Sequence, residues 1–435
     1  MSIFPAVATR KERVAIAPTR VWLPGAFSLV FFCTFDIALA AAAEPLGLNE
    51  AVRLAASQAP IIQAREAAVE SAQSTVIPAG QLPDPQLTFG IDSLPVTTSE
   101  AFSLTRDNFT ERKIGVMQQF PRREKRRLRS ERAQAAATRD QAMLTSETLS
   151  VRESVARAWI ARETTERRLQ LLQALEPRAQ AQVAAATAAL SSGRGSAADG
   201  IAAKSAQAML ADRISQAERD IDEARAEFAR WLPDVADRPL GDAPDWSDLG
   251  IDPESIVTHA GRHRELLAYA AVEHIANTEV ALARADKHPD WSVELAYAQR
   301  GPQYSNFVSL QFRVDLPIFP RSRQDPMIVS KLAALTQIQA EREDALRMHI
   351  ALLRKTLAVW RSSNERAHRY ERELIPLADD RVESALAAYR GGHGDMQAAL
   401  TALDAAIEQR IAYTELQTTL GEAWAALHFA FPQER

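Results

Sequence analysis

The chain contains the same order of predicted elements twice, and this duplication constrains the fold more than any other feature of its 435 residues. In each half, a helical stretch leads to a proline-rich turn, two segments of alternating hydrophobicity and a very long helical stretch interrupted at glycine. Pro177 precedes Gly193 by 16 positions, and Pro376 precedes Gly392 by the same 16. The sequence therefore predicts two repeats, at 44–252 and 253–435.

Four short segments alternate apolar and polar residues with a period of two, which is typical of strands with one apolar face. They lie at about 85–94, 112–120, 290–298 and 306–316. Each has roughly the 9 to 11 residues of a strand that crosses a membrane. Two hairpins of a sheet in a soluble protein would show the same pattern, and this alternative stays open. In the membrane reading, the predicted lipid-facing residues include Leu87, Phe89, Trp291, Val293, Leu310 and Phe312.

The long stretches between these segments are predicted to be helical. From Leu210 to Trp231, apolar or small residues recur at alternating steps of four and three, as in a coiled-coil seam. As a single helix, 122–190 would be about 100 Å long, so it needs packing partners along its whole length. Pro177 and Pro376 are expected to kink the two longest helices, because an interior proline removes a backbone hydrogen bond. The fold class is therefore mainly α, with long coiled-coil helices and four strands.

Composition argues against one class of partner. The formal net charge is -5, whereas nucleic-acid-binding proteins usually carry a basic excess. Hydrophobic residues make up 46% of the chain but aromatic residues only 6%, because alanine supplies much of the apolar count. Alanine is the strongest helix former, which agrees with long, closely packed helices. We expect no nucleic-acid partner.

Residues 1–43 are predicted to be a signal peptide for export. Four basic residues between positions 10 and 20 precede an apolar run at 21–35 and then a small-residue stretch, with cleavage expected after Ala40 or Ala43. A membrane anchor is the alternative, although Pro24 and Gly25 interrupt a run that is short for a span. The only cysteine, Cys33, lies inside this segment, so the mature chain would contain no disulfide.

We find no spacing of residues that predicts catalysis, a cofactor or a metal site, so the chain is not expected to be an enzyme. His259 and His263 are four residues apart and could share a helix face, but two histidines without a third ligand are weak evidence for zinc. A basic run from Arg122 to Arg129 follows the second alternating segment. It is interpreted as a solvated or interfacial helix face, with Glu124 and Glu131 as local partners.

Three motifs resemble the TolC family of outer-membrane efflux proteins, in particular its branch similar to CzcC, which exports heavy-metal cations. They are the sequence from Leu82 to Leu87, the sequence from Lys113 to Pro121, and Lys125 to Arg129. The resemblance covers nearly the whole mature chain, and it lies more in the order of the elements than in any single motif.

The resemblance implies a homotrimer in the outer membrane, in which each protomer gives four strands to one β-barrel and its helices to a periplasmic tunnel. It also implies two partners, a periplasmic adaptor (membrane fusion) protein and an inner-membrane pump of the resistance-nodulation-division type. The expected function is then the passive exit duct of a tripartite efflux pump. The need for several copies also follows physically, because bacterial barrels begin at eight strands and an open sheet edge in lipid leaves backbone groups unsatisfied.

The same resemblance implies that the turns at Gly193 and Gly392 are periplasmic tips, closed by polar contacts that involve Asp199 and Tyr389. The match is incomplete, because Gly394 stands where the best-known members carry an arginine. Where those members carry pore-constricting aspartates this sequence has Ala398 and Thr401, and Asp404, one turn further along, is the expected substitute. In the alternative interpretation, Asp199 only caps a helix and Tyr389 only packs between helices.

A soluble periplasmic coiled-coil adaptor or scaffold is the second functional hypothesis, with the alternating segments forming a small sheet. The sequence does not distinguish a metal cation from an organic compound as cargo, and it does not identify the cognate pump and adaptor.

Overall fold

The computed structural model describes residues 44–432 except positions 98 and 251, so the predicted signal peptide at 1–43 lies outside the described residues. The unit that begins at Glu44 consists mainly of helices, with one small antiparallel sheet. The helices of its first half are α1 (Leu48–Gln58), α2 (Pro60–Gly80), α3 (Arg123–Gln173), α4 (Glu176–Ser191) and α5 (Ala197–Trp231). Those of its second half are α6 (Pro253–Thr258), α7 (Tyr269–Ala285), α8 (Gln324–Arg369), α9 (Ile375–Gly391) and α10 (Met396–His428).

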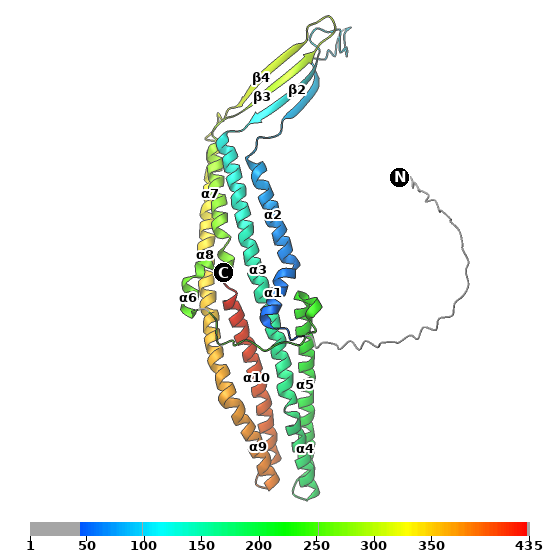
Figure 1. Ribbon diagram of the computed structural model, residues 1–435, viewed down its shortest axis with the longest axis vertical. Coiled ribbons are helices and arrows are strands. Elements are labelled where there is room, and N and C mark those ends of the chain that lie inside the picture. The colour runs from blue at the N-terminus through cyan, green and yellow to red at the C-terminus, as the bar shows by residue number, and fades with distance from the viewer. Residues whose placement is uncertain (1–43, 98, 251, 433–435) are drawn as a thin grey trace, which may run out of the picture. The chain divides into compact units, whose positions relative to one another are not determined.

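The strands occupy the positions where the sequence alternates. They are β1 (Gln86–Asp92), β2 (Glu111–Phe120), β3 (Asp290–Gln299) and β4 (Phe307–Asp315). Within this unit the sheet lies at one end of the helices, and the turns α4–α5 and α9–α10 lie at the other end (Figure 1). The chain therefore reaches both ends twice, once in each half.

Helix α3 is the element that the other helices share. Its first half packs against α2 and α7, and its second half packs against α5 and α10 (Figure 1). Helix α8 packs against α7 and then against α10. Each long helix thus has neighbours on both sides, which supplies the partners that helices of this length require.

Both predicted kinks correspond to breaks in the helices. Helix α3 ends at Gln173, two turn residues follow, and α4 starts at Glu176 with Pro177 in its first turn. In the second half, a five-residue π-helix, η4 (Tyr370–Leu374), separates α8 from α9, where Pro376 is again in the first turn. Pro177 is tolerated because an amide in the first turn of a helix has no intrahelical acceptor, and Pro376 follows a π-helical turn that widens the hydrogen-bond ladder ahead of it.

The predicted seam of α5 is buried at five of its seven positions, namely Leu210, Ile214, Ala217, Ile221 and Phe228. Leu210 and Ile214 pack with residues of α3 and α10 in one hydrophobic cluster. Apolar burial at steps of three and four therefore holds α5 against its neighbours.

The described part of the connector between the halves, residues 232–250 and 252, is irregular apart from a short 3-10 helix, η1 (Pro233–Val235), and one bridge from Leu240 to Leu46. Its carbonyl groups are paired by side chains of the long helices. Trp360 of α8 donates its indole N–H to the carbonyl of Trp246 at 2.9 Å, and Trp424 of α10 donates to that of Asp248 at 2.7 Å. Buried Arg162 of α3 donates to the carbonyl of Ala236 at 2.7 Å. A loop that crosses a helical core is stable here because its polar backbone groups have partners.

One helical stretch was predicted too simply. The helical stretch predicted ahead of the second pair of alternating segments is not one continuous helix, because α6 ends at Thr258 and two 3-10 helices, η2 (Ala260–Arg262) and η3 (Arg264–Leu266), precede α7. The break places His263 in the interior, where its ring stacks on that of His349 with centroids 4.3 Å apart. Tertiary packing has overridden local helix propensity at this point.

We predict that Leu210→Ala lowers the free energy of unfolding by about 2 to 5 kcal/mol, because it leaves a cavity in the α5 seam. Leu210 is 1% exposed. Its neighbour Met209 is 55% exposed, so Met209→Ala is the matched control and should change stability by less than about 0.5 kcal/mol. Urea denaturation of the two variants measures the difference, and equal losses would contradict the assigned seam.

Candidate functional site: an apolar sheet face and two helical turns

The sheet has the order β1-β2-β3-β4, with antiparallel pairing throughout. The hairpin β1–β2 comes from the first half of the chain and the hairpin β3–β4 from the second. Pairing of β2 with β3 joins them into one sheet. Because directly paired residues point to the same side of a sheet, the register determines which residues share a face. Strands β1 and β4 are the edges, and every residue of both is exposed.

Four successive rows of paired residues form one face of this sheet, which we call the apolar face. Its polar groups are the side chain of Gln118 and the hydroxyl of Tyr297. The rows are Phe89–Ile114–Tyr297–Val308, Leu87–Val116–Leu295–Leu310, Gln118–Val293–Phe312, and Phe120–Trp291–Val314. All six residues predicted from the sequence to face lipid lie on this apolar face. Phe89 is 82% exposed and Leu310 is 60% exposed, so the face is open to its surroundings.

Aromatic residues mark both limits of the apolar face. The first row contains Phe89 and Tyr297, and the last contains Phe120 and Trp291, whose rings stack with centroids 4.3 Å apart. The four rows extend over about 20 Å along the strands, close to the height of the apolar band of a membrane-spanning sheet. Aromatic residues at both edges of such a band are typical of the two membrane–water interfaces.

The opposite face of the sheet is polar and closely packed. Lys113 pairs with Asp92 at 2.6 Å, and Thr88 donates to Glu294 at 3.4 Å. At Gly115 an added Cβ would lie 2.8 Å from the Cβ of Ala296, so a larger residue would collide with the next strand. Small residues allow the strands to approach on this side, as they do on the inner side of a curled sheet.

A buried lysine joins the sheet to the helices beneath it. Lys125, in the first turn of α3, is only 6% exposed and pairs with Asp290 of β3 at 2.9 Å and Asp286 at 3.3 Å. The sequence placed Lys125 in a solvated or interfacial run, so its burial is a correction. Periodicity explains it, because Lys125 and Leu128, three residues apart on one helix face, are the buried positions of that run. Of the two predicted acidic partners, Glu131 pairs with Arg127.

No helix among residues 44–432, with positions 98 and 251 left out, has the length and apolar character needed to cross a membrane.

At the other end of the helices, each turn contains a glycine that requires a left-handed backbone. Gly193 has a φ of +72° and Gly392 a φ of +76°, a region that favours glycine. The next helix in each case begins with a side-chain cap. The hydroxyl of Ser196 accepts a hydrogen bond from the amide of Asp199, and the carboxylate of Asp395 accepts one from the amide of Ala398. The two turns therefore have the same construction.

Asp199 and Tyr389 lie near each other but share no recorded hydrogen bond. Asp199 completes a capping box, in which its carboxylate accepts from the amide of Ser196 at 2.9 Å. Tyr389 packs against a cluster of small and apolar residues between the two turns, and its hydroxyl is buried without a hydrogen-bond partner in the described chain. Burial raises the pKa of Tyr389, and the nearby charge of Asp199 raises it further.

Asp404 occupies a different position from this pair. It lies on α10 and forms an ion pair at 3.2 Å with Arg213 of α5, which also pairs with Glu408 at 2.7 Å. These contacts tie the α4–α5 hairpin to the α9–α10 hairpin. The structure thus brings Asp199 and Tyr389 together and assigns Asp404 to a separate contact between the hairpins.

Sequence reasoning missed a further contact between the hairpins, just beyond the two helix breaks. Asp379 of α9 pairs with Arg178 of α4, and it accepts from Arg410 of α10 at 2.7 and 2.9 Å. Arg178 directly follows Pro177, and Asp379 is three residues after Pro376. The matched prolines were the available signal for this contact. Pro177 and Pro376 stand at equivalent positions in the two halves, just before Arg178 and Asp379.

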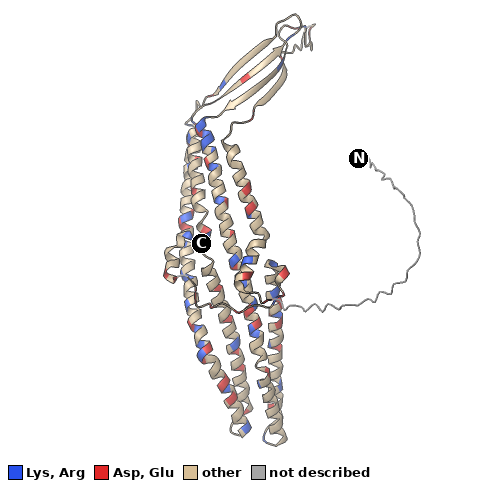
Figure 2. Cartoon of the chain, in the orientation of Figure 1, with Lys and Arg blue, Asp and Glu red and all other residues tan. Residues whose placement is uncertain are grey.

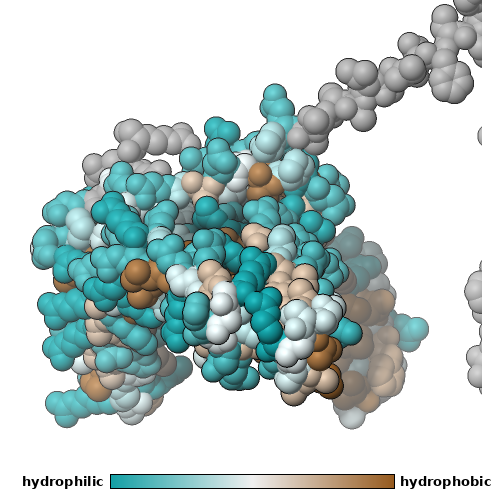
Figure 3. Space-filling view, turned by 90° about the horizontal axis from the view of Figure 1, so that it is seen from below, coloured by the Kyte–Doolittle hydropathy of each residue, from teal (hydrophilic) through white to brown (hydrophobic). Residues whose placement is uncertain are grey.

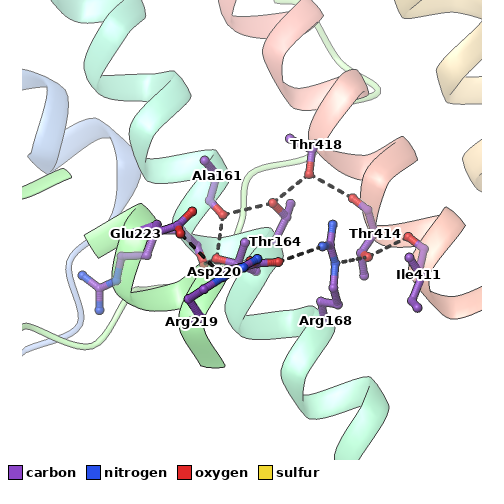
Figure 4. Close-up of polar contacts among 11 residues, drawn as sticks. Ala161, Thr164, Arg168, Arg219, Asp220, Glu223, Ile411, Thr414 and Thr418 are labelled. Atoms are coloured by element: carbon purple, nitrogen blue, oxygen red, sulfur yellow. Dashed lines mark hydrogen bonds and ion pairs between the residues drawn. The ribbon is translucent and has the colours of Figure 1, made fainter. Parts of the chain in front are cut away.

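Polar contacts also connect α3 to both hairpins (Figure 4). The hydroxyl of Thr418 on α10 donates to that of Thr164 on α3 at 2.8 Å, and Arg168 donates to Thr414 at 3.1 Å. Arg168 also pairs with Asp220 of α5 at 3.5 Å. One arginine of α3 therefore contacts a helix from each hairpin.

Seen from the end that carries the turns, the surface is mainly hydrophilic, with small hydrophobic areas among polar residues (Figure 3). The hydrophilic surface at this end contrasts with the exposed apolar face of the sheet. A surface of this kind is suited to an aqueous compartment.

The two histidines considered as zinc ligands do not act together. His259 donates a hydrogen bond from Nδ1 to the carbonyl of Ser255 at 2.8 Å, whereas burial, and then neighbouring His349, lowers the pKa of His263 to about 4. Across the described part of the chain, no group of three or more His, Cys, Asp or Glu side chains could hold a metal ion.

The long helices, the four-stranded sheet at one end and the two turns at the other also occur together in solved structures of outer-membrane channels. Solved structures with this fold resemble the chain over most of its length. CusC, studied for its transmembrane channel formation, has a TM-score of 0.75 and 13% identity, and the match covers 88% of this chain and 92% of CusC. The outer-membrane channel OprN has a TM-score of 0.73 and 15% identity over 88% of this chain and 90% of its own.

The outer membrane protein VceC of Vibrio cholerae gives a TM-score of 0.72 and 17% identity, over 88% of this chain and 95% of VceC. No protein-family model matches the sequence, and no curated protein matches it either. At identities this low, the likeness establishes the fold, which the chain shares over nearly the full length of these channels.

We predict that Lys125→Met destabilises the junction between sheet and helices by about 1 to 3 kcal/mol, because it leaves carboxylates without their cation. Arg127→Met is the matched control, since Arg127 is 65% exposed and its pair with Glu131 should contribute less than about 1 kcal/mol. Thermal unfolding of the purified variants measures both effects. A Lys125→Met midpoint equal to that of the control would contradict this role.

Proposed function

We propose that the chain is an outer-membrane channel subunit of the TolC type, the passive exit duct of a tripartite efflux pump. The observation that carries the proposal is the apolar face, which continues across hairpins from both halves of the chain. A sheet in a soluble protein buries such a face against other elements, whereas β1 and β4 are exposed along their whole length. Lipid is the environment that would cover it.

The proposed assembly is a homotrimer. Each edge of the sheet carries backbone groups that need partners in lipid, and antiparallel pairing of β4 with β1 of the next protomer would supply them. Three copies give twelve strands, enough for a barrel with a lumen, whereas two would give a barrel filled by its own side chains. The polar, closely packed face would then line the lumen.

The matching order of elements in the two halves supports an internal duplication, with repeats at 44–252 and 253–435. The helical end with its hydrophilic turns would extend into the periplasm. There it would meet a periplasmic adaptor protein and, through it, an inner-membrane pump of the resistance-nodulation-division type. Export of heavy-metal cations is the proposed cargo function and rests on the CzcC-like motifs alone.

We predict that Leu310→Arg prevents insertion or trimer assembly, because an arginine on the lipid face costs about 2 to 4 kcal/mol near the bilayer midplane. Gln311→Arg is the matched control, since Gln311 is also exposed and points to the polar face. Membrane fractionation and native electrophoresis of the two variants provide the test. Equal assembly of both would contradict the assigned lipid face, and recovery of the unmodified protein in the soluble periplasm would overturn the channel function.

The proposed gate lies at the two turns. The buried Tyr389 hydroxyl has no partner within the described chain, so in a trimer it could donate to a carboxylate of an adjacent hairpin. A hydrogen bond to a charged group is worth about 1.5 to 3 kcal/mol, and a ring of such contacts can hold a closed state. Asp199 is the proposed second member, besides its role in the capping box.

We predict that the double variant Asp199→Ala, Tyr389→Phe raises the open current of the channel in planar bilayers. Ser196→Ala is the control, because it removes the other half of the capping box and leaves both proposed gate residues in place. An unchanged closed channel in the double variant, or an equal rise in the control, would mean that these residues only cap and pack.

A further inference from the structure

Exposed arginines surround the base of the sheet where it meets the helices. Arg122 and Arg123 precede or begin α3, and Arg321 and Arg323 lie between β4 and α8. The structure records no ion pair for these four guanidinium groups within the described chain, although its ion pairs include most neighbouring cations, such as Lys125 and Lys287. We call these four residues the arginine collar. Figure 2 shows basic residues gathered at these helix ends.

The arginine collar directly follows the apolar face. Leu316, Ile318 and Phe319 continue from β4, and each is more than 60% exposed. Two residues after Phe319 the chain reaches Arg321. On the other hairpin, Phe120, whose ring stacks on that of Trp291, is two residues before Arg122. On both chain segments that lead from the sheet to a helix, β2 to α3 and β4 to α8, apolar side chains are thus followed within a few residues by arginines without an ion pair in the described chain.

A groove between α2 and α3 lies beside the collar. It has a volume of about 520 Å³, and its lining includes Val76, Gly80, Arg123, Arg126 and Arg127. The Nε atom of Arg126 is buried and lacks a hydrogen-bond partner, and its guanidinium makes only a long contact of 3.5 Å with the carbonyl of Gly80. The groove therefore offers donors that the protein itself does not use.

We infer that the arginine collar and this groove bind the phosphate groups of anionic phospholipids in the leaflet next to the helices. Guanidinium groups match phosphate geometry with paired hydrogen bonds, and long arginine side chains can extend along an apolar surface to a headgroup. This inference rests on the proposed membrane location. The ligand would be a diacyl lipid whose chains cover the apolar face while its phosphate contacts the collar.

The test uses the full mature protein in nanodiscs of mixed phosphatidylcholine and phosphatidylglycerol. The collar variant changes Arg122, Arg123, Arg321 and Arg323 to Gln. The matched control changes four exposed arginines far along the chain, Arg354, Arg366, Arg369 and Arg372, to Gln. The lipids retained by each protein after detergent extraction are quantified. We expect the unmodified protein and the control to enrich phosphatidylglycerol and the collar variant to lose this enrichment about tenfold.

A second variant replaces the same four collar residues by Lys and should keep most of the enrichment, because the charges remain. Enrichment that is equal in the unmodified protein and the collar variant overturns the inference, and so does an equal loss in the control. If inorganic phosphate stabilises the protein against heat as strongly as phosphatidylglycerol does, the bound phosphate does not come from a lipid and the inference is overturned. Unmodified protein that stays outside the nanodiscs overturns the proposed function as well, whereas insertion without enrichment overturns only the lipid site.

Discussion

The length of α3 is the constraint on which the rest of the structure depends. Its 51 residues extend over about 76 Å, and a helix of this length needs neighbours at every level. Helices α2 and α7 cover it near the sheet, and α5 and α10 cover it near the turns. The connector between the halves crosses this bundle, and tryptophans and Arg162 satisfy its carbonyl groups. The helices therefore place the sheet and the turns at opposite ends of one unit.

The two ends have opposite surface chemistry, and this difference supports the proposed function. The sheet presents an exposed apolar face with aromatic residues at both limits, and the turns present a mainly hydrophilic surface. Between them, the Lys125 contacts connect sheet and helices. A protein that places one end in lipid and the other in water would need this arrangement, because each surface would be unstable in the other environment.

The contacts between the two hairpins suggest how the helical end is held together. Asp379 accepts from arginines of both hairpins, Arg213 pairs with Asp404 across them, and Arg168 of α3 contacts both. Each contact is polar and at least one of its partners is largely shielded from solvent, so loss of one partner would leave a part-buried charge without its counter-ion. The helix breaks before Pro177 and Pro376 lie next to the Asp379 cluster, where a change in hairpin direction would begin.

Local sequence pattern by itself located the strands, the long helices and the apolar face. Alternation with a period of two placed all six residues predicted to face lipid on one face of the sheet, because a strand exposes every second side chain to the same side. The three-and-four spacing likewise located the α5 seam. Only tertiary structure decided which polar residues meet: the burial of Lys125, the inward position of His263 and the pairing of Asp404 with Arg213 all depend on neighbours distant in sequence. A periodic pattern depends on one element, whereas a buried charge depends on the partner that another element brings to it.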